Sequence, residues 1–338
     1  MKPEKILVLS LRYLGDTLLT RPTLRALRLQ FPESKIDILV PSTTEVALEN
    51  FPYNIRPIVW PRSTQRAIRR AMKIFVQGYD WVIDLTGNDR TALLSLLSRA
   101  SLRVCYEKKQ PWWPRWRSRL YNLRITHEKK KPHKLLQHQK LLEACDVTFQ
   151  GISLELKSNE KAEKKIASFF SAYLGKKVIL AHLTSRDMQK SLPIPLVRQV
   201  MSDLIKQNIT IIFTHGKARQ EKDYVTACVQ GFASSQLQIM PQLSWDELIA
   251  LIMKVDVYWG VDTAPTHIAS DLQKPMLVHY GPSHVEQWRP LNPKAEIIIS
   301  SCTCLKTKQC PEGVSGKCFN SLSASQIIST LEKLLKNY

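Results

Sequence analysis

Residues 5–22 read KILVLSLRYLGDTLLTRP, an apolar run followed by a turn and then by the start of a helix. The run KILVLS is typical of a buried strand, and apolar residues at helical spacing predict a helix over residues 16–30. A nucleotide-binding fold often carries a glycine-rich turn here, whereas this turn has Gly15 followed directly by Asp16. We expect Gly15 to permit a tight turn. We expect Asp16 to act either as a helix N-cap or as a base that accepts a proton from an attacking hydroxyl.

Strand-like and helix-like runs alternate along the chain, which is the pattern of parallel sheets covered by helices. A first series ends with the strand LRVCYE, and a second begins near residue 177. The 338 residues are therefore expected to form an α/β protein with two doubly wound domains. We expect an N-terminal domain over 1–172 and a C-terminal domain over 173–338, with the last helix a candidate to pack back on the first domain.

The composition is that of a soluble globular protein, with 44% hydrophobic and 23% charged residues. The net charge of +20 favours an anionic partner, such as nucleic acid, an acidic membrane surface or an anionic substrate. The N-terminus lacks the pattern of a signal peptide, and no window has the roughly 18 apolar residues that a membrane helix needs. We therefore expect a cytoplasmic protein.

Open α/β sheets bind ligands beyond the carboxyl ends of their strands, so the strand-to-helix turns are the candidate sites. In GVDTAPTHIA, residues 260–269, Asp262 and Thr263 stand where a strand gives way to a helix, and His267 lies on the first helical turn. Free N–H groups at a helix start attract phosphate. An N-cap with a packed histidine is the structural alternative.

Two further turns carry residue types that suit a nucleotide. In AHLTSRDMQKSLP, residues 181–193, the hydroxyls of Thr184 and Ser185 and the cation Lys190 could hold a diphosphate, or could form a plain polar loop. In THGKARQEKDY, Glu221 could bind ribose hydroxyls or cap its helix. The loop YGPSHVEQWRP, residues 280–290, suggests an ordered loop with an aromatic anchor, for which structural packing is also plausible.

The segments ILVLSLRYLGDTLLTRPTLRALRLQFP, KIDILV and VDTAPTHIASDLQKPMLVHYGPSHVEQWRP together resemble glycosyltransferase family nine, the ADP-heptose:lipopolysaccharide heptosyltransferases. They are most similar to the lipopolysaccharide core heptosyltransferase III branch. The resemblance covers nearly the whole chain. It implies a GT-B fold, in which two Rossmann-like domains face across a cleft, with the acceptor in the first and the nucleotide sugar in the second. It also implies an inverting, metal-independent transfer of heptose from ADP-heptose to the inner core, without a cofactor.

The same resemblance assigns roles to individual residues. It makes Asp16 the general base. It makes a second group the donor-binding residues: Thr184, Ser185, Lys190, Glu221, Asp262, Thr263 and His267.

This chain departs from the family pattern at three points. Ala264 stands where a glycine is usual, which alters how closely a phosphate can approach the backbone. Lys190 lies one residue further along than expected. Pro265 is also unusual, although a proline suits the first turn of a helix. Apart from these departures, the resemblance places the ribose-binding acid at Glu221, with Gln220 as the alternative one position earlier.

Residues 107–134 are rich in Lys, Arg and Trp and are interrupted by prolines, which predicts a long loop or an irregular helical excursion. Tryptophan favours the membrane–water interface and cations favour anionic headgroups, although the tryptophans could also pack on the domain. We expect a peripheral association with the inner membrane of a Gram-negative bacterium, by a monomer that binds a lipopolysaccharide core acceptor and no nucleic acid. The candidate acceptor or membrane contacts are Arg12, Gly15, Trp112, Trp113, Arg115, Trp116 and Arg117.

A late run contains Cys302, Cys304, Cys310 and Cys318. Four cysteines in a short loop could form a structural zinc site, but their spacing lacks the C-x2-C of zinc knuckles, so we expect free thiols and no metal.

Other functions remain open on the sequence alone. They are another doubly wound nucleotide-sugar enzyme such as an epimerase or hydrolase, a glycosyltransferase with a different donor sugar, and a non-catalytic nucleic-acid-binding or scaffolding protein. The absence of G-x-G-x-x-G disfavours a dinucleotide enzyme.

Overall fold

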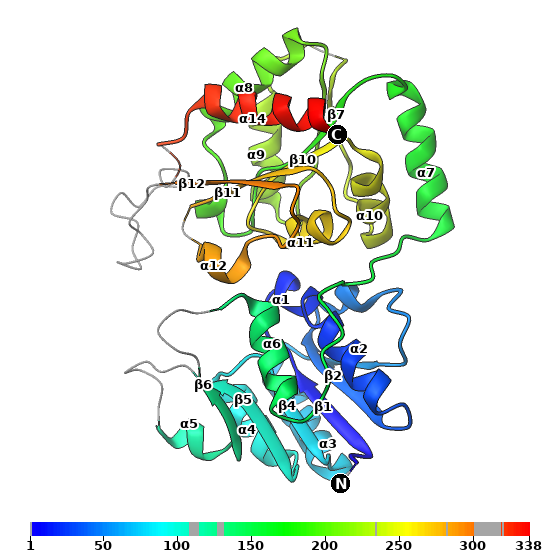
Figure 1. Cartoon of the computed structure of the whole chain (residues 1–338), viewed down its shortest axis with the longest axis vertical. Helices are drawn as coiled ribbons and strands as arrows, with labels where there is room; N and C mark the ends of the chain where they lie inside the picture. Colours follow the sequence, from blue (N-terminus) through cyan, green and yellow to red (C-terminus); the bar gives the residue numbers. More distant parts are fainter. Residues whose placement is uncertain are drawn as a thin grey trace. The chain divides into compact units, whose positions relative to one another are not determined.

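The computed structural model describes residues 2–107, 115–126, 132–233, 235–281, 283–300, 319 and 321–338, and of Arg115 the backbone only. The chain divides into two compact units, which we call unit 1 (Met1–Glu155) and unit 2 (Leu156–Tyr338) (Figure 1). Among the described residues, each unit holds one six-stranded parallel sheet with helices around it. These two doubly wound sheets confirm the predicted α/β fold.

In unit 1 the strand order is β3-β2-β1-β4-β5-β6, so the chain builds one half of the sheet outward from β1 and the other half outward from β4. Leu9 at the end of β1 lies in register with Asp84 at the end of β4. This reversal point is where a doubly wound sheet offers its ligand crevice. The elements are β1 (Lys5–Leu9), α1 (Leu14–Leu18), α2 (Arg21–Gln30), β2 (Lys35–Pro41), β3 (Arg56–Trp60), α3 (Thr64–Gln77), β4 (Trp81–Asp84), α4 (Asp89–Leu97), β5 (Leu102–Glu107), α5 (Arg115–Arg119), β6 (Leu123–Thr126) and α6 (Lys134–Glu143).

The two faces of this sheet are covered by different helices because successive strand residues point to opposite sides. Ile6 and Val8 of β1 pack in a cluster with residues of α2 and α6. Leu7 and Leu9 pack in another cluster with Ile74 of α3 and with α4. All four β1 side chains are fully buried, which explains the unbroken apolar run of this central strand.

Unit 2 repeats the topology, with strand order β12-β11-β10-β7-β8-β9 and its reversal point between β7 and β10. Gly260 of β10 lies in register with His182 of β7. The elements are α7 (Glu160–Phe170), β7 (Val178–His182), α8 (Ile194–Lys206), β8 (Thr210–Phe213), α9 (Arg219–Val229), β9 (Leu237–Ile239), α10 (Trp245–Lys254), β10 (Val257–Val261), α11 (Ala264–Asp271), β11 (Met276–Tyr280), α12 (Val285–Trp288), β12 (Ala295–Ile299) and α14 (Ala324–Asn337).

The main core of unit 2 joins the sheet to three helices. Residues of α8, α9 and α14 pack with Ile179, Phe213 and Trp259 in one buried cluster. The last helix, α14, contributes Ile327 and Leu331 to this cluster and lies against α8, so it packs within unit 2. On α10, Ser244 caps the helix start in a capping box with Glu247, as its position in the sequence predicts.

Three local predictions differ from the structure. The single helix predicted over 16–30 is divided into α1 and α2, because Pro22 lies in the first turn of α2, where its missing N–H is tolerated. The segment 107–134, predicted as a loop or irregular excursion, contains α5 and the strand β6, which pairs with β5. Helix α7 and strand β12 are not among the elements predicted from the sequence. No helix in the described part of the chain is long and apolar enough to cross a membrane.

Candidate functional site

The turn after β1 in unit 1 places Asp16 on α1 with only 7% of its surface exposed. Its Oδ1 atom is buried and makes no hydrogen bond to any described residue. A buried carboxylate oxygen without a donor is costly, so such an atom at a reversal point is a sign of a ligand site. The predicted N-cap role does not apply, since Tyr13 occupies that position and Asp16 lies within the helix. Gly15 is the second residue of α1 and has no positive φ, so the predicted tight turn is wrong.

A second loop, after β4, is tied to the first. The Leu11 N–H donates to Thr86 Oγ1 at 2.8 Å, and the Arg12 guanidinium donates to the Thr86 carbonyl at 3.3 Å. Asp84 holds the second loop by accepting the N–H groups of Thr86 at 2.8 Å and Gly87 at 2.9 Å. Burial raises the pKa of Asp84, and the hydrogen bonds, which act to lower it, offset only part of this effect. The two loops therefore form one rigid edge beside Asp16.

Lys134, the first residue of α6, completes the charge arrangement around Asp16. Its Nζ is buried and donates to the Leu85 carbonyl at 3.2 Å, directly after β4. Burial lowers the pKa of Lys134 to about 8, while the nearby carboxylate of Asp16 acts in the opposite direction and Arg12 adds to the lowering. One turn further along α6, His138 Nδ1 lies 3.2 Å from the Leu19 carbonyl. Burial keeps the pKa of His138 well below its usual value, so the imidazole is neutral.

In unit 2, an ion pair joins the loops after β7 and β10, the two strands at the reversal point. Lys190 Nζ lies 2.7 Å from Asp262 Oδ2, and the side chains are 27% and 9% exposed. Lys190 belongs to a 3-10 turn after β7, and Asp262 follows β10 directly. The structure therefore brings together two residues that the sequence places in separate turns. A partly exposed ammonium oriented by a carboxylate is well suited to bind an anionic group.

Thr263 stands at the N-cap of α11 and makes no capping hydrogen bond with its side chain. Its hydroxyl donates to the Val261 carbonyl at 3.3 Å. Pro265 in the first helical turn is compatible with the helix, as expected from its missing N–H. His267 is buried with its ring 6.5 Å from that of Trp288, which lies within the 280–290 loop at the end of α12. Its placement agrees with a packed histidine, and Trp288 is the aromatic anchor of that loop.

Glu221 is buried on the first turn of α9 and reaches back to the turn after β8. Its Oε2 accepts the Gly216 N–H at 3.1 Å, and a Cβ at Gly216 would lie only 2.4 Å from Oε1. This close approach explains why glycine occupies position 216. Burial raises the pKa of Glu221. Gln220 is exposed and donates to the Arg186 carbonyl at 2.8 Å, so the two candidates for the ribose-binding acid have different surroundings.

Thr184 and Ser185 lie at the start of the loop that follows β7. Thr184 is fully buried, and its hydroxyl accepts from Ser191 Oγ at 3.3 Å. The Ser185 backbone N–H also donates to Ser191 Oγ at 3.3 Å. Next to this loop, burial and the charge of His215 lower the pKa of His182 to about 4, so His182 is neutral and serves as a packing residue.

The basic, tryptophan-rich segment is only partly within the described residues. Trp112, Trp113 and the Arg115 side chain lie outside them, whereas Trp116 is 42% exposed on α5. Arg117 is buried, and its Nε donates to Asp89 Oδ1 at 2.9 Å. Its guanidinium thus ties α5 to α4 and does not point freely to a surface.

Across the described ranges, no group of three or more His, Cys, Asp or Glu side chains is placed to hold a metal ion. The predictions for Cys302, Cys304, Cys310 and Cys318 fall outside these ranges.

Sequence reasoning did not single out Lys134 or Asp84. The run YDWVIDLTG predicted a strand and a turn, and the acid at its end is the only signal that could have pointed to Asp84. Lys134 follows a proline–histidine pair, and the local sequence predicts an exposed residue at the start of a helix. Its contact with a carbonyl 49 positions away gives it a role that local sequence does not show.

The chain is similar to known proteins in both sequence and fold. The sequence profile of glycosyltransferase family 9 (heptosyltransferase) matches residues 66–315. The chain is 25% identical over 292 residues to lipopolysaccharide heptosyltransferase 3 of Escherichia coli K12, covering 83% of each chain. Among solved structures, a family 9 glycosyl transferase from Veillonella parvula superimposes with a TM-score of 0.79 at 20% identity, covering 99% of this chain and 98% of that one. The E. coli ADP-heptose lps heptosyltransferase II gives a TM-score of 0.77 at 19% identity, covering 98% and 99%.

Proposed function

The chain belongs to glycosyltransferase family 9, and on that basis we propose that it transfers heptose from ADP-heptose to the core of lipopolysaccharide. The relatives support this choice, since one is a lipopolysaccharide heptosyltransferase 3 and another is an ADP-heptose lps heptosyltransferase. The observation that carries the proposal is the buried carboxylate of Asp16, with an oxygen that no described residue donates to, at the reversal point of the first sheet. Such an oxygen is available to accept a proton from a bound hydroxyl.

The reaction is a single displacement with inversion. A hydroxyl of the acceptor attacks the anomeric carbon of the donor, and its proton passes to Asp16. The bond between that carbon and the diphosphate oxygen breaks, and ADP leaves with the bonding electrons. No metal ion takes part, so cations, hydroxyls and N–H groups of the protein must stabilise the leaving diphosphate.

Donor binding is assigned to unit 2. Lys190 supplies a cation to the diphosphate, oriented by Asp262, and the N–H groups at the start of α11 add donors beside Thr263. Thr184, Ser185 and His267 line the same end of the sheet. Glu221 holds the ribose hydroxyls, for which its buried carboxylate is better placed than the exposed Gln220.

Lys134 acts on Asp16 as a positioning residue. Its buried ammonium attracts the Asp16 carboxylate, which favours one position of that side chain. Hydrogen bonding to the Leu85 carbonyl fixes the lysine in place. Arg12 lies beside the same loop and, with Gly15, contributes to the acceptor side.

The acceptor places the enzyme at the cytoplasmic side of the inner membrane of a Gram-negative bacterium, where we propose that it associates peripherally as a monomer. Trp116, together with Trp112, Trp113 and the cationic side chains of the same segment, supplies one contact. Arg117 is left out of this contact because it is paired with Asp89. The net charge of +20 favours the anionic bilayer surface.

The proposed activity is tested by incubating the purified protein with ADP-heptose and a panel of truncated lipopolysaccharide acceptors, with products identified by mass. We expect one heptose to be added to at least one acceptor that ends in the inner core. The same panel with other nucleotide sugars tests the alternative of a different donor. Absence of product with every donor and acceptor would contradict the proposal.

A further inference from the structure

Helix α3 exposes an apolar stripe that a surface helix normally buries. Ile68, Met72, Phe75 and Val76 recur at helical spacing, and between 45% and 81% of each residue is exposed. Ala71 and Ile74, on an adjacent side of the helix, supply the contact with the sheet cluster beneath it. The exposed stripe is therefore additional to the packing that holds α3 in the fold.

Helix α4, which contacts α3 on the same face of the sheet, also exposes apolar side chains. Leu93, Leu96 and Leu97 of α4 are each between 41% and 49% exposed. Exposed apolar side chains on two neighbouring helices are typical of an interaction surface. We call it the α3–α4 face, composed of Ile68, Met72, Phe75, Val76, Leu93, Leu96 and Leu97.

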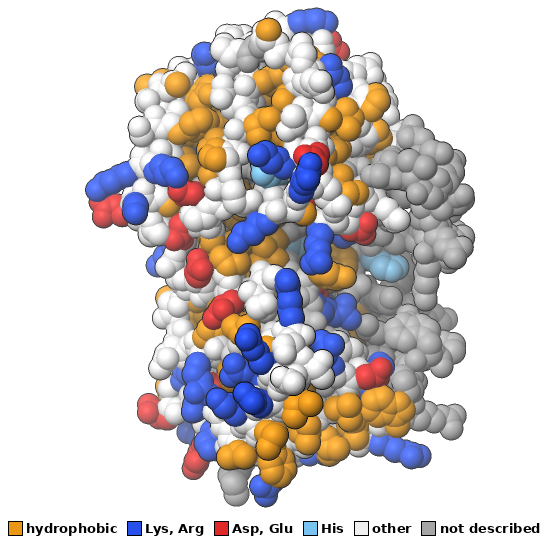
Figure 2. Space-filling model, turned by 180° about the vertical axis from the view of Figure 1, so that it is seen from behind, with side chains coloured by type: hydrophobic (Ala, Val, Ile, Leu, Met, Phe, Trp, Pro, Cys, Tyr) orange, Lys and Arg blue, Asp and Glu red, His pale blue; other side chains and the backbone are white. Residues whose placement is uncertain are grey.

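Cations border this face. Helix α3 carries Arg66, Arg69, Arg70 and Lys73 and no acidic residue, and none of these four forms an ion pair with a described residue. The Arg99 guanidinium lies over the Phe75 ring, 5.4 Å from its centre. Figure 2 shows this side of unit 1, where hydrophobic side chains gather at the lower end of the view with Lys and Arg side chains beside them.

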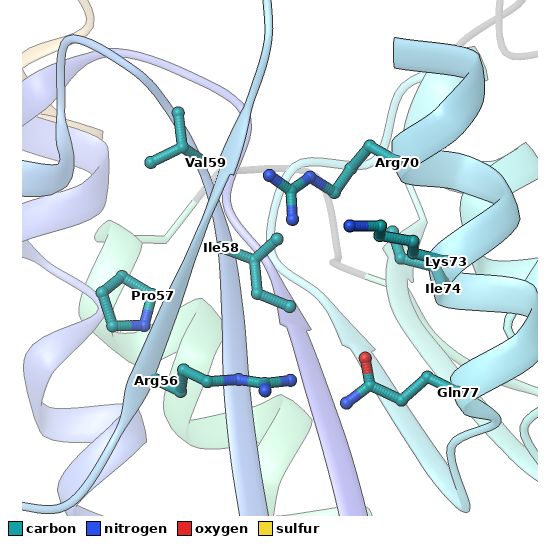
Figure 3. A pocket seen from close by; sticks show the side chains of 8 residues that line it. All are labelled: Arg56, Pro57, Ile58, Val59, Arg70, Lys73, Ile74 and Gln77. Atoms are coloured by element: carbon teal, nitrogen blue, oxygen red, sulfur yellow. The ribbon is translucent and has the colours of Figure 1, made fainter. Parts of the chain in front are cut away.

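A cavity of about 410 Å³ opens between β3 and α3, on the cationic side of the helix. Arg56 from β3 and Arg70 and Lys73 from α3 extend toward the same space (Figure 3). Arg56 is already held by Asp37 through two hydrogen bonds of 2.8 and 2.7 Å. Arg70 and Lys73 pair with no acid in the part of the chain that the structure describes, so the cavity offers two cations to an anion.

We propose that the α3–α4 face is a docking surface for an anionic lipid bilayer, with its apolar side chains in the interface and a lipid phosphate in the cavity beside Arg70 and Lys73. This deepens the proposed function by assigning a membrane contact separate from the tryptophan-rich segment. The docking surface rests on the proposed function in one respect: that function explains why the protein would bind a membrane.

The chemistry of the face favours a bilayer over other partners. A second copy of this chain would bring two cationic borders together and oppose pairing by like-charge repulsion. Nucleic acid would use the cations and leave the apolar side chains in water. When an amphipathic helix with a basic border lies on anionic lipid, its apolar side chains leave water and its cations contact the headgroups.

The apolar part is tested by co-sedimentation of the full chain with vesicles of phosphatidylcholine, with and without phosphatidylglycerol, in the absence of donor and acceptor. The test variant is Met72→Ser/Val76→Ser, at the two most exposed positions of the stripe. The matched control is Leu29→Ser/Leu174→Ser, two exposed leucines on other surfaces. We expect the test variant to lose most binding to anionic vesicles while the control keeps it, with unchanged circular dichroism for both. Equal binding by wild type and test variant would overturn the proposal.

The cationic part is tested with Arg70→Gln/Lys73→Gln against the control Lys161→Gln/Lys336→Gln, which removes the same charge from unit 2. Each cation near an anionic surface contributes about 1 kcal/mol, so we expect affinity to fall roughly fivefold per cation in the test variant. An equal fall in the control would show that net charge alone drives binding and would overturn the docking site. Concentration-dependent dimers in sedimentation equilibrium, abolished by Met72→Ser/Val76→Ser, would assign the face to a second copy and also overturn it.

These outcomes are independent of the proposed activity. Vesicle binding without transfer of any sugar would leave the docking surface standing and contradict the enzyme assignment. Transfer to a soluble truncated acceptor without vesicle binding would support the enzyme assignment and contradict the docking surface.

Discussion

Lys190 and Asp262, which are 72 positions apart in the sequence, form an ion pair of 2.7 Å that joins the loops after β7 and β10. The pair lies at the reversal point of the second sheet, where doubly wound folds bind ligands. Neither turn alone distinguishes a phosphate site from an ordinary polar loop. Their contact supplies a cation held in position by an acid, which is what a leaving diphosphate requires.

Replacing this cation tests the donor site. We expect Lys190→Met to weaken ADP-heptose binding roughly 10- to 100-fold, because a hydrogen bond to a charged group is worth about 1.5–3 kcal/mol. Isothermal titration calorimetry measures the change. The control Lys206→Gln, which breaks an exposed ion pair with Asp203, should leave affinity unchanged. Unaltered affinity in Lys190→Met would remove this lysine from the donor site.

The ribose-binding acid is distinguished by comparing Glu221→Gln with Gln220→Ala. We expect only Glu221→Gln to weaken donor binding. Since burial raises the pKa of Glu221, wild-type affinity should fall as the pH drops through a range above that of an exposed glutamate, and the variant should lack this fall. Donor affinity measured against pH checks both points. The reverse ranking of the two variants would assign the role to Gln220.

The same pKa shift predicts a stability effect. A carboxyl whose pKa is raised in the folded state contributes stability at low pH and loses it as the pH rises through the folded pKa. Glu221→Gln should therefore not lower the melting temperature at neutral pH. A large decrease there would show that the ionised carboxylate stabilises the fold.

For Lys134 we predict a change of stability with pH that has the opposite sign to that of Glu221. Because burial lowers its pKa from 10.5 to about 8, the unfolded chain binds more protons between these values, so the stability of the wild type should rise with pH across that interval. Lys134→Met should abolish this rise, as thermal unfolding at a series of pH values can show. If wild-type stability is flat over this interval, the lysine is not buried as described.

A positioning role for Lys134 predicts a kinetic effect as well. Without the nearby ammonium, the Asp16 carboxylate loses an attraction that holds it in place, so kcat should fall in Lys134→Met while the KM for ADP-heptose stays unchanged. Lys134→Arg, which keeps the charge, should restore part of kcat. Equal kcat values for Lys134→Met and Lys134→Arg, with the same loss of melting temperature, would indicate a purely structural lysine.

The sequence was most informative where a motif follows a buried central strand. Asp16, Asp262 and Lys190 all follow strands that the alternation of strands and helices predicts, and the structure places them at the reversal points of the two sheets. The edge strands β6 and β12 escaped prediction because short, partly exposed runs lack the continuous apolar signal of a central strand.

Residues whose role comes from long-range contacts were beyond the reach of the sequence. Lys134 is buried only because α6 returns to the end of β4, and Arg117 is buried only because Asp89 of α4 lies beside it. Local chemistry suggests solvent or membrane for both side chains. The exposed stripe of α3 could not be predicted for a different reason. The sequence shows that α3 is a helix with apolar residues at helical spacing, but it does not show which of these residues contact the sheet and which stay exposed.

The central claim is that Asp16 takes the proton from the acceptor, and the most direct measurement is heptose transfer by Asp16→Asn beside its affinity for ADP-heptose. We predict a loss of kcat of about 100- to 10,000-fold, the range of a removed general base, with donor affinity unchanged. Glu45→Gln, which alters an exposed acid in the same unit, should behave as wild type. Transfer by Asp16→Asn at a rate close to that of the wild type would contradict the account.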